Sequence, residues 1–518
     1  MVTPVRLQPF VIAAAVCALL QALVSGGSGY LLGKAIADTP SPDPFAAPPS
    51  APPPPSSEPP SPEPTEPSEP PAAGYAEPRG DRPVVRLRFD VADDLASVTG
   101  SETVVFTPDL RVCELVFRLW PNKPETALAG NELSVSTATV DGVEVTPVIE
   151  ATGAPEGSTG TLVELPIAGC AEPGQQVTAE LEFALLLGQD TPERVGWSAE
   201  ESMAWFATAF PLLAWEHGVG WMRNPAVELF GETVGSESFR LELLEVVAPD
   251  GLEVMGTGEL QGTTDVGSSG RTAHAFSADA VRDVAVVVGE LEVSSTEVDG
   301  TAVHVAVPAV GSVAGVDVWE QASAESLALV SGYLGSYPYT DLWMTVVPDF
   351  PTGVEFPGAI FYGDVDPAEF IELVPHETAH MWLYGLVGNN QGRDPWLDEG
   401  ITSYVEAHVL GFDEFLLGQP VPAQAEGYLG ASMQFWATMD PTGDLYGAGV
   451  YGAGASTMAD ARAASDPEAF DASLRAYVSA QAYQIATPED LRQAFGSVPE
   501  ALAVLEDAGA FAGDAGDP

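Results

Sequence analysis

Hydrophobic and polar residues alternate along the front part of this chain. Residues 84–89 and 102–106 have this pattern, and turns rich in Asp, Gly and Pro separate such segments. Alternation with a period of two indicates half-buried β-strands. Because the pattern continues through residues 238–243 and 284–288, the sequence predicts an N-terminal β domain over residues 83–297.

The spacing of hydrophobic residues changes after residue 298. A short apolar segment, residues 304–307, precedes a stretch with helical spacing from about residue 316 to 334, and a further strand pattern covers residues 343–347. Helical spacing then dominates to about residue 511. These patterns predict an α+β domain over residues 298–440 and a helical C-terminal part over residues 441–518.

Residues 1–37 have the order of an export segment. Arg6 precedes an apolar run over residues 10–24, and small residues follow at positions 35–37. Cleavage after Ala37 would release the protein, whereas the further apolar stretch 30–32 would allow residues 10–32 to remain as a membrane tether. Both outcomes predict an extracytoplasmic protein, either secreted or anchored at the outer face of the cell membrane.

Residues 38–82 are dominated by Pro, Ser, Glu and Ala. Such a composition cannot bury enough apolar surface to fold, so we expect a disordered, semi-extended linker. The linker would hold the folded domains away from a membrane or envelope layer, or it would be a disordered leader without that role.

Charge and cysteine content narrow the function further. The formal net charge of −57, from 75 acidic and 18 basic residues, disfavours nucleic acid as a partner.

Cys113 and Cys170 both fall in predicted strands, and in an oxidising compartment they would form a disulfide or remain as two buried thiols. The sequence leaves the oligomeric state open.

Residues 376–380 read His-Glu-Thr-Ala-His. The two histidines are four positions apart on a predicted helix, so His376 and His380 extend from the same face and can share one ion. Imidazole nitrogen suits Zn²⁺, and a catalytic zinc site has three protein ligands and an open position. Glu399, 18 residues beyond His380 at the start of a second predicted helix, can be the third ligand, because the glycines and asparagines of residues 388–392 allow the chain to turn back.

The motif at 376–382, followed by Trp-Leu-Asp-Glu-Gly at 396–400, resembles the gluzincin family that contains aminopeptidase N and the leukotriene hydrolase. Residues 115–122 are also similar to this family. The resemblance implies a multidomain fold: an all-β, saddle-like N-terminal domain, an α+β thermolysin-like catalytic domain and a short helical C-terminal part. It implies one zinc ion per chain and the activity of a zinc metallopeptidase.

Residues 352–358, Thr-Gly-Val-Glu-Phe-Pro-Gly, are similar to the family's exopeptidase motif. The resemblance implies that Glu355, with Gly353 and Val354, binds the substrate and that the Glu355 carboxylate holds its free α-ammonium group. The chain departs from the motif at Val354, where the family usually has Met, and at Phe356, where it usually has Asn. The resemblance thus predicts an aminopeptidase whose partner is a peptide with a free N-terminus.

Residues 450–455, Val-Tyr-Gly-Ala-Gly-Ala, are similar to a tyrosine segment of the same family, although Ala453 stands where Lys is common. The resemblance implies that Tyr451 donates a hydrogen bond to the oxyanion formed from the attacked carbonyl. Tyr446 is a rival candidate. Glu377 would act as general base, and Glu406, on the same helix face as Glu399, is a candidate to orient a ligand histidine.

Two alternatives remain at this stage. The chain would be a gluzincin hydrolase of other specificity, either an endopeptidase or an enzyme with a non-peptide substrate, or it would be a catalytically silent binding protein tethered at the cell surface. The retained Glu377 argues against a silent protein. The other histidines, His217, His274, His304 and His408, are expected to have structural or surface roles.

Overall fold

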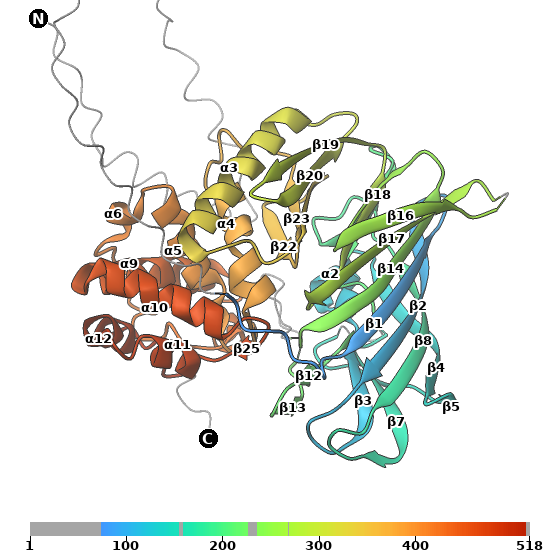
Figure 1. Ribbon diagram of the computed structural model, residues 1–518, viewed down its shortest axis with the longest axis horizontal. Coiled ribbons are helices and arrows are strands. Elements are labelled where there is room, and N and C mark those ends of the chain that lie inside the picture. Colours follow the sequence, from blue (N-terminus) through green and yellow to red (C-terminus); the bar gives the residue numbers. More distant parts are fainter. Residues whose placement is uncertain (1–73, 155–158, 226–235, 268, 514–518) are drawn as a thin grey trace, which may run out of the picture.

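The computed structural model describes residues 74–154, 159–225, 236–267 and 269–513. Strands dominate the chain up to residue 290, which we call the β half, and a mixed sheet with helices follows from residue 291 onwards, which we call the helical half (Figure 1). The predicted export segment, residues 1–37, and residues 38–73 of the predicted linker lie outside the described residues. In the part of the chain that is described, no helix is both long enough and apolar enough to cross a membrane.

The β half consists of one large sheet and several small ones. The eight-stranded sheet has the order β16-β17-β14-β1-β2-β8-β4-β5, and two four-stranded sheets have the orders β15-β18-β10-β9 and β11-β3-β7-β6. Strands β12 and β13 form a separate pair. The bounds are β1 Val84–Val91, β2 Ser97–Phe106, β3 Val112–Arg118, β4 Glu132–Val140, β5 Val143–Val145, β6 Val148–Glu150, β7 Leu162–Ala171, β8 Val177–Leu186, β9 Val195–Ser198, β10 Met203–Ala207, β11 Leu212–Leu213, β12 Trp215–Glu216, β13 Gly220–Trp221, β14 Phe239–Pro249, β15 Glu253–Gly256, β16 Glu259–Asp265, β17 Arg271–Val281 and β18 Ala285–Gly289, with the short helices η1 Trp120–Asn122 and α2 Pro124–Leu128 between β3 and β4.

Alternation in the sequence explains how these strands pack. In β1 and β8 buried residues occupy every second position, so each strand turns one apolar face to the core. Cys113 of β3 and Cys170 of β7 form a disulfide between neighbouring strands. The alternative of two buried thiols is therefore excluded, and the β half carries a covalent cross-link.

The helical half begins with a five-stranded sheet of order β19-β20-β21-β23-β22. Its strands are β19 Leu291–Val298, β20 Thr301–Pro308, β21 Asp341–Val347, β22 Gly353–Phe356 and β23 Ala359–Gly363. Strand β19 pairs along its length with β20, so residues 291–297 belong to this sheet and not to the β domain predicted for residues 83–297. The sequence pattern could not show this, because hydrophobic and polar residues alternate in the same way in strands on both sides of the boundary.

The two faces of this sheet pack against different parts of the molecule. Side chains such as Trp343, Val347 and Phe361 belong to the same core cluster as the β half. Their neighbours in sequence, including Met344 and Val346, belong to the core of the helical half. All seven residues of β21 are buried, as expected for a central parallel strand covered on both faces. The sheet therefore joins the two halves.

Helices make up the rest of the helical half, in the part of the chain where hydrophobic spacing predicts them. The predicted helix at residues 316–334 is confirmed as α3, Val316–Leu334, which packs across β19 and β20 (Figure 1). The others are α4 Leu373–Ala379, η2 Met381–Leu386, η3 Pro395–Leu397, α5 Glu399–Val409, α6 Asp413–Leu416, α7 Met433–Met439, α8 Asp444–Tyr446, η4 Gly447–Gly452, α9 Ala453–Ala464, α10 Pro467–Ala480, α11 Pro488–Ala494 and α12 Pro499–Asp507, with the short strands β24 Gly388–Asn389 and β25 Ile485–Ala486 paired between them.

The end of the predicted linker packs against the helical half. Trp382 Nε1 donates a 2.9 Å hydrogen bond to the Tyr75 hydroxyl, which in turn donates to the carbonyl of Ser336. The main chain of Ala76 donates to the carbonyl of Ser479 at 3.1 Å. The prediction of a disordered linker is thus wrong for residues 74–82. The physical reason is that Tyr75, an aromatic residue in this Pro-rich segment, accepts a hydrogen bond from the buried Trp382.

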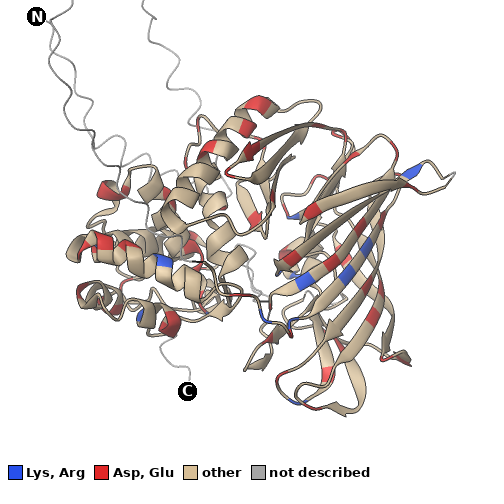
Figure 2. Cartoon of the chain, in the orientation of Figure 1, with Lys and Arg blue, Asp and Glu red and all other residues tan. Residues whose placement is uncertain are grey.

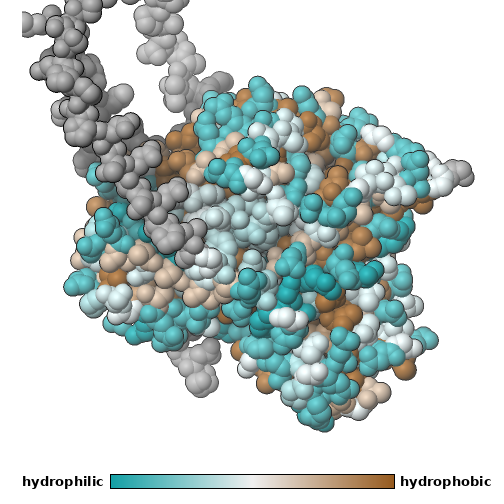
Figure 3. Space-filling model, viewed as in Figure 1, coloured by the Kyte–Doolittle hydropathy of each residue, from teal (hydrophilic) through white to brown (hydrophobic). Residues whose placement is uncertain are grey.

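Acidic residues lie on both halves of the molecule and far outnumber basic ones (Figure 2). Figure 2 shows Asp and Glu on the helices and strands of both halves, whereas Lys and Arg are few. On the face seen in Figure 3, hydrophobic residues form small groups among hydrophilic ones. The repulsion of polyanions expected from the net charge therefore applies to both halves.

Candidate active site

The two motif histidines lie at the C-terminal end of α4. The Nε2 atoms of His376 and His380 are 3.2 Å apart. Their rings are edge to face, with centroids 4.9 Å apart. The two histidines therefore extend from the same helix face, as their spacing of four residues predicts, and both imidazoles direct a nitrogen atom at one point.

Glu399 is the first residue of α5, and its carboxylate faces the same point. Its Oε2 atom lies 3.4 Å from His376 Nε2 and 3.3 Å from His380 Nε2. Helices α5 and α9 approach closely here, because a Cβ at Gly454 would lie only 2.5 Å from the Cα of Gly400. Two glycines at the crossing therefore allow α5 to bring Glu399 to the histidines.

The three ligand atoms fit a zinc ion. With zinc–nitrogen bonds of about 2.0–2.1 Å, tetrahedral geometry separates neighbouring ligand atoms by roughly 3.3 Å. The three measured separations, 3.2, 3.3 and 3.4 Å, agree with this value. Burial would raise the pKa of Glu399, but the neighbouring His380 and His376 hold it well below its ordinary value, so this carboxylate is ionised as a ligand must be. Among the described residues, Glu399 Oε2 is also buried without a conventional hydrogen bond, as a metal-facing atom would be.

Two further carboxylates hold the far side of each imidazole. His376 Nδ1 is 3.1 Å from Glu406 Oε2, which confirms the contact predicted for Glu406. His380 Nδ1 is 2.8 Å from Asp398 Oδ1, and Gln391 Nε2 donates to the other oxygen of Asp398 at 2.9 Å. These contacts place the proton of each neutral ring on Nδ1 and leave both Nε2 atoms free for a metal.

Glu377 follows His376 in α4 and lies against strand β22. A Cβ at Gly353 would approach the Glu377 side chain to within 2.4–2.5 Å, so the strand can lie this close only because residue 353 is glycine. Burial raises the pKa of Glu377 to about 7. One of its oxygens is buried without a hydrogen bond within the described part of the chain. Glu377 is thus a carboxylate that can take up a proton near neutral pH.

Strand β22 is the last strand of its sheet, and Glu355 lies in the middle of it. Its carboxylate comes within 4.8 Å of ligand-type atoms of His380 and Asp398. Glu355 is 4 % exposed, and its Oε1 atom has no hydrogen-bond partner among the described residues. Burial raises the pKa of Glu355 to about 8. A buried carboxylate oxygen without a partner beside the zinc ligands can receive a charged group of a ligand.

The neighbours of Glu355 point the other way. Val354 and Phe356 belong to the core cluster of the β half, as strand alternation requires. The sequence resemblance implied that Val354 contacts the substrate. Because its side chain packs in this core, a contact with the substrate would have to come from its main chain.

Of the two candidate tyrosines, Tyr451 is the better placed. Its ring is nearly parallel to that of His376, with centroids 6.1 Å apart, and the charge of the nearby Glu399 acts on its hydroxyl. Tyr446 packs edge to face on Tyr451 at 5.9 Å and is fully buried. Burial raises the pKa of Tyr451 well above its ordinary value, so the hydroxyl keeps its proton and can donate a hydrogen bond.

The β half fixes the chain where α4 ends. Helix α4 is followed by η2, in which the backbone leaves helical geometry at Leu383 and Tyr384. Arg282, fully buried, donates to the carbonyls of Gly385 at 3.2 Å and Leu386 at 3.3 Å. The next residue, Asp283, accepts from Tyr384 at 3.4 Å. Arg282 and Asp283 could not be linked to the site from the sequence, because they lie in a strand connection about 100 residues before the motif.

Three of the four remaining histidines pair with an acidic residue outside the zinc site. His304 pairs with Asp341, His408 with Asp413 and His217 with Asp109.

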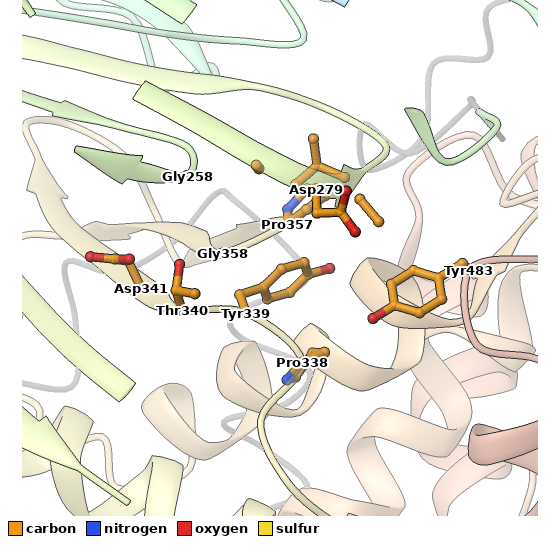
Figure 4. Close-up of a pocket in the computed structure, with 12 residues that line it drawn as sticks. Gly258, Asp279, Pro338, Tyr339, Thr340, Asp341, Pro357, Gly358 and Tyr483 are labelled. Atoms are coloured by element: carbon orange, nitrogen blue, oxygen red, sulfur yellow. The ribbon is translucent and has the colours of Figure 1, made fainter. Parts of the chain in front are cut away.

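A cavity near Asp341 lies between the two halves, lined by residues that include Tyr339, Asp279 and Tyr483 (Figure 4). Figure 4 shows the two tyrosine rings pointing toward one another across it. None of the zinc-site residues lines this cavity, so it is separate from the site.

Asp398, which contacts His380, is another residue that sequence reasoning missed. It precedes Glu399 directly, in the segment Trp-Leu-Asp-Glu-Gly. Its position next to the ligand Glu399, at the start of α5, could have suggested this contact, because an acidic side chain there can reach a neighbouring helix.

Comparisons with known proteins agree with this geometry. Residues 321–507 match the model of the Peptidase family M1 domain. Aminopeptidase M1-A from Oryza sativa subsp. japonica is 28 % identical over 235 residues, which is 40 % of this chain, and Aminopeptidase M1-B from the same organism is 27 % identical over 236 residues. The matches span only 26 % of the length of these relatives.

Solved structures match over a larger share of the chain. An M1 zinc metallopeptidase from Deinococcus radiodurans has a TM-score of 0.59 and 18 % identity, with 86 % of this chain and 99 % of that chain covered. A mutant of an M1 zinc metallopeptidase from the same organism, solved with a Tyr-Ser-Ala substrate, has the same score and coverage. The shared fold is that of a two-domain metallopeptidase, which confirms the predicted fold class. The family uses a catalytic zinc ion, and the matched M1 domain, the aminopeptidase relatives and the metallopeptidase structures together support placing residues 321–507 among the aminopeptidase N-like gluzincins.

Proposed function

We propose that this protein is a zinc-dependent aminopeptidase that hydrolyses the first peptide bond of peptides with a free N-terminus. The single observation that carries the proposal is the Glu355 carboxylate. It is buried beside His380, and one of its oxygens has no hydrogen-bond partner in the described part of the chain. A substrate ammonium group is the ligand that such an oxygen accepts best.

Each residue has a role that follows from its position. His376, His380 and Glu399 would hold the zinc ion, and zinc in such a site polarises the substrate carbonyl and lowers the pKa of water. Glu377 takes a proton from the attacking water and passes it to the departing amine. Tyr451 donates its hydroxyl hydrogen to the oxyanion that develops on the carbonyl.

Glu355 determines where cleavage occurs. When it binds the α-ammonium group, the first peptide bond is the one that faces Glu377 and the zinc ligands. A blocked N-terminus carries no positive charge and would leave the buried carboxylate without a partner, so we expect such peptides to be poor substrates. The neighbour from Deinococcus radiodurans with bound Tyr-Ser-Ala supports a peptide substrate.

We further propose that the substrates are exported or extracellular peptides. The order of charged, apolar and small residues in 1–37 supports export. The disulfide between Cys113 and Cys170 supports an oxidising compartment. Sequencing the N-terminus of the mature protein after expression in an exporting host would distinguish a cleaved signal from a retained tether.

The test uses amino-acid amides with free N-termini, N-acetylated peptides and a chelator. The wild-type protein should hydrolyse the free amides, lose activity with chelator and regain it with zinc. Glu355→Ala should lower kcat/KM for the free amides by about a hundredfold, because a charge-assisted contact is lost. An unchanged rate with Glu355→Ala would favour an endopeptidase or a non-peptide hydrolase, and zinc binding without any hydrolysis would favour a silent binding protein.

A further inference from the structure

The β half contributes an arginine next to the strand that bears Glu355. Arg194 immediately precedes β9, and it is 4 % exposed. Its guanidinium lies over the ring of Trp120 at 4.3 Å and over the ring of Phe356 at 5.3 Å. It also donates to the Thr208 hydroxyl at 3.4 Å. A planar cation is thus held between one ring from each half of the molecule.

Phe356 is the residue directly after Glu355 in β22. Because β22 is the edge strand, hydrogen bonds to β23 hold it on one side only. On the other side of the strand its position depends on side-chain packing. Phe356 is fully buried in the core cluster of the β half, so its contact with Arg194 is part of what fixes this four-residue strand.

We propose that Arg194 is a positioning residue that holds Phe356 and thereby fixes Glu355 in the geometry that captures the substrate's α-ammonium group. The inference rests on the proposed aminopeptidase function. It also accounts for the departure from the family motif at residue 356, because an aromatic ring provides the face on which a guanidinium stacks and an asparagine does not. The exopeptidase specificity of this chain is therefore built by both halves together.

Burial lowers the pKa of Arg194, and the nearby charge of Glu355 opposes that shift. The contacts of Arg194 to Trp120 and Phe356 use the flat face of its guanidinium group. The ammonium group of a lysine has no such face and cannot reproduce them. Arg194→Lys keeps the positive charge and removes the stacking plane. Arg194→Met keeps much of the side-chain volume and removes both.

The measurement is the ratio of kcat/KM for a free amino-acid amide to kcat/KM for its N-acetylated peptide counterpart, taken with the zinc-loaded, full-length protein. With Arg194→Met we expect KM for the free amide to rise about tenfold, because misplacing a binding group by a fraction of an ångström weakens it. Cleavage of the blocked peptide should change less than twofold. A purely structural loss would lower both activities together and leave the ratio unchanged.

Phe356→Asn should lower the same ratio by a similar factor. The double variant, Arg194→Met with Phe356→Asn, should be no worse than either single variant, since each removes the same contact. Arg194→Lys is expected to fall between the wild type and Arg194→Met. This milder variant keeps the test available if Arg194→Met folds poorly.

Arg118→Met is the matched control. Arg118 is also a buried arginine of the β half, 2 % exposed, and it donates to the carbonyls of Met222 and Asn224. Its loss should cost stability without changing the ratio. If Glu355→Ala lowers the ratio but both Arg194→Met and Arg194→Lys retain the wild-type value, the positioning role is wrong while the aminopeptidase function stands. If Glu355→Ala itself leaves the ratio unchanged, the proposed function is what fails.

Discussion

Each half of the molecule buries a glutamate, and the two differ in what surrounds them. Glu102 of β2 is 2 % exposed and Glu377 of α4 is 5 % exposed. Burial raises the pKa of both. Neither oxygen of Glu102 has a hydrogen-bond partner within the described residues, and its surroundings are largely apolar, with Phe210 and Phe239 nearby.

Glu377, in contrast, lies among other ionisable groups. The charges of His376, His380 and Glu399 all act on it. A buried acid is therefore not by itself a sign of an active site. What distinguishes the helical half is the convergence of several such groups at the distances that one metal ion requires.

The largest effect is expected from Glu377→Gln. The amide cannot accept a proton from water, so kcat should fall by a factor of about 1,000 or more. Since Glu377 is not among the three ligand atoms, the variant should still bind one zinc ion per chain. Peptide hydrolysis and metal analysis of the purified protein test the two expectations together.

Glu102→Gln provides the control for that experiment. The substitution makes the same chemical change at a buried glutamate of the β half, and it should leave kcat and zinc content unchanged. An active Glu377→Gln variant would contradict the role of general base. A loss of activity with Glu102→Gln at full stability would contradict the contrast between the two halves.

The second prediction concerns the disulfide, which is confined to the β half. The helical half contains no cysteine in its sequence. Replacing both Cys113 and Cys170 by Ser removes a cross-link between residues 57 positions apart. We expect a loss of about 4 kcal/mol in the free energy of unfolding, because the unfolded chain gains conformational freedom.

Chemical denaturation followed by tryptophan fluorescence would measure this loss. Below the unfolding transition the double variant should remain active, since the disulfide contacts no residue of the zinc site. An unchanged midpoint of unfolding would contradict the prediction, as would a lost zinc site in the folded variant.

The third prediction concerns Asp283, at the junction of the two halves. Burial raises its pKa from 3.8 to about 6. Because the folded protein disfavours the ionised form, Asp283 lowers the stability as the pH rises from about 4 to about 6 and beyond. The full cost corresponds to about 3 kcal/mol.

Asp283→Asn removes this titration. The free energy of unfolding should therefore fall less steeply between pH 4 and pH 6 in the variant than in the wild type. Denaturation curves at several pH values measure the slope. Asp265→Asn, at an exposed position of β16, is the control. Equal slopes in wild type and Asp283→Asn would contradict the prediction.

Local patterns predicted much of the fold. The bounds of α3 and the start of α5 at Glu399 follow from hydrophobic spacing, and the zinc ligands follow from spacing in the motif. These features depend on residues close in sequence. The placement of β19 did not follow, because the same alternation suits the sheet of either half.

Long-range contacts could not be predicted in the same way. Arg282 contacts η2 and Arg194 contacts Phe356, in both cases across more than 100 residues. Asp398 was missed because the sequence does not indicate which of two adjacent acids faces the metal and which faces an imidazole nitrogen. The sequence therefore predicts the chemistry of the site better than the contacts that hold it in place.

The last and smallest effect concerns the glycine contact between α5 and α9 in the helical half. A Cβ at Gly454 would lie 2.5 Å from Gly400 Cα, so Gly454→Ala forces the two helices apart. Alanine favours a helix over glycine by about 1 kcal/mol, but overpacking costs about 1–3 kcal/mol. The net result should be a small loss of stability. Because Glu399 and Tyr451 lie on the two sides of this contact, kcat should fall by roughly tenfold.

Gly332→Ala is the matched control. Gly332 lies in α3, and a Cβ there would meet no atom within 4 Å. This variant should gain up to about 1 kcal/mol in the free energy of unfolding with kcat unchanged. If Gly454→Ala behaves like Gly332→Ala in both measurements, the close approach of the helices does not position Glu399 and Tyr451, and the precision of the site must come from the carboxylates around the histidines alone.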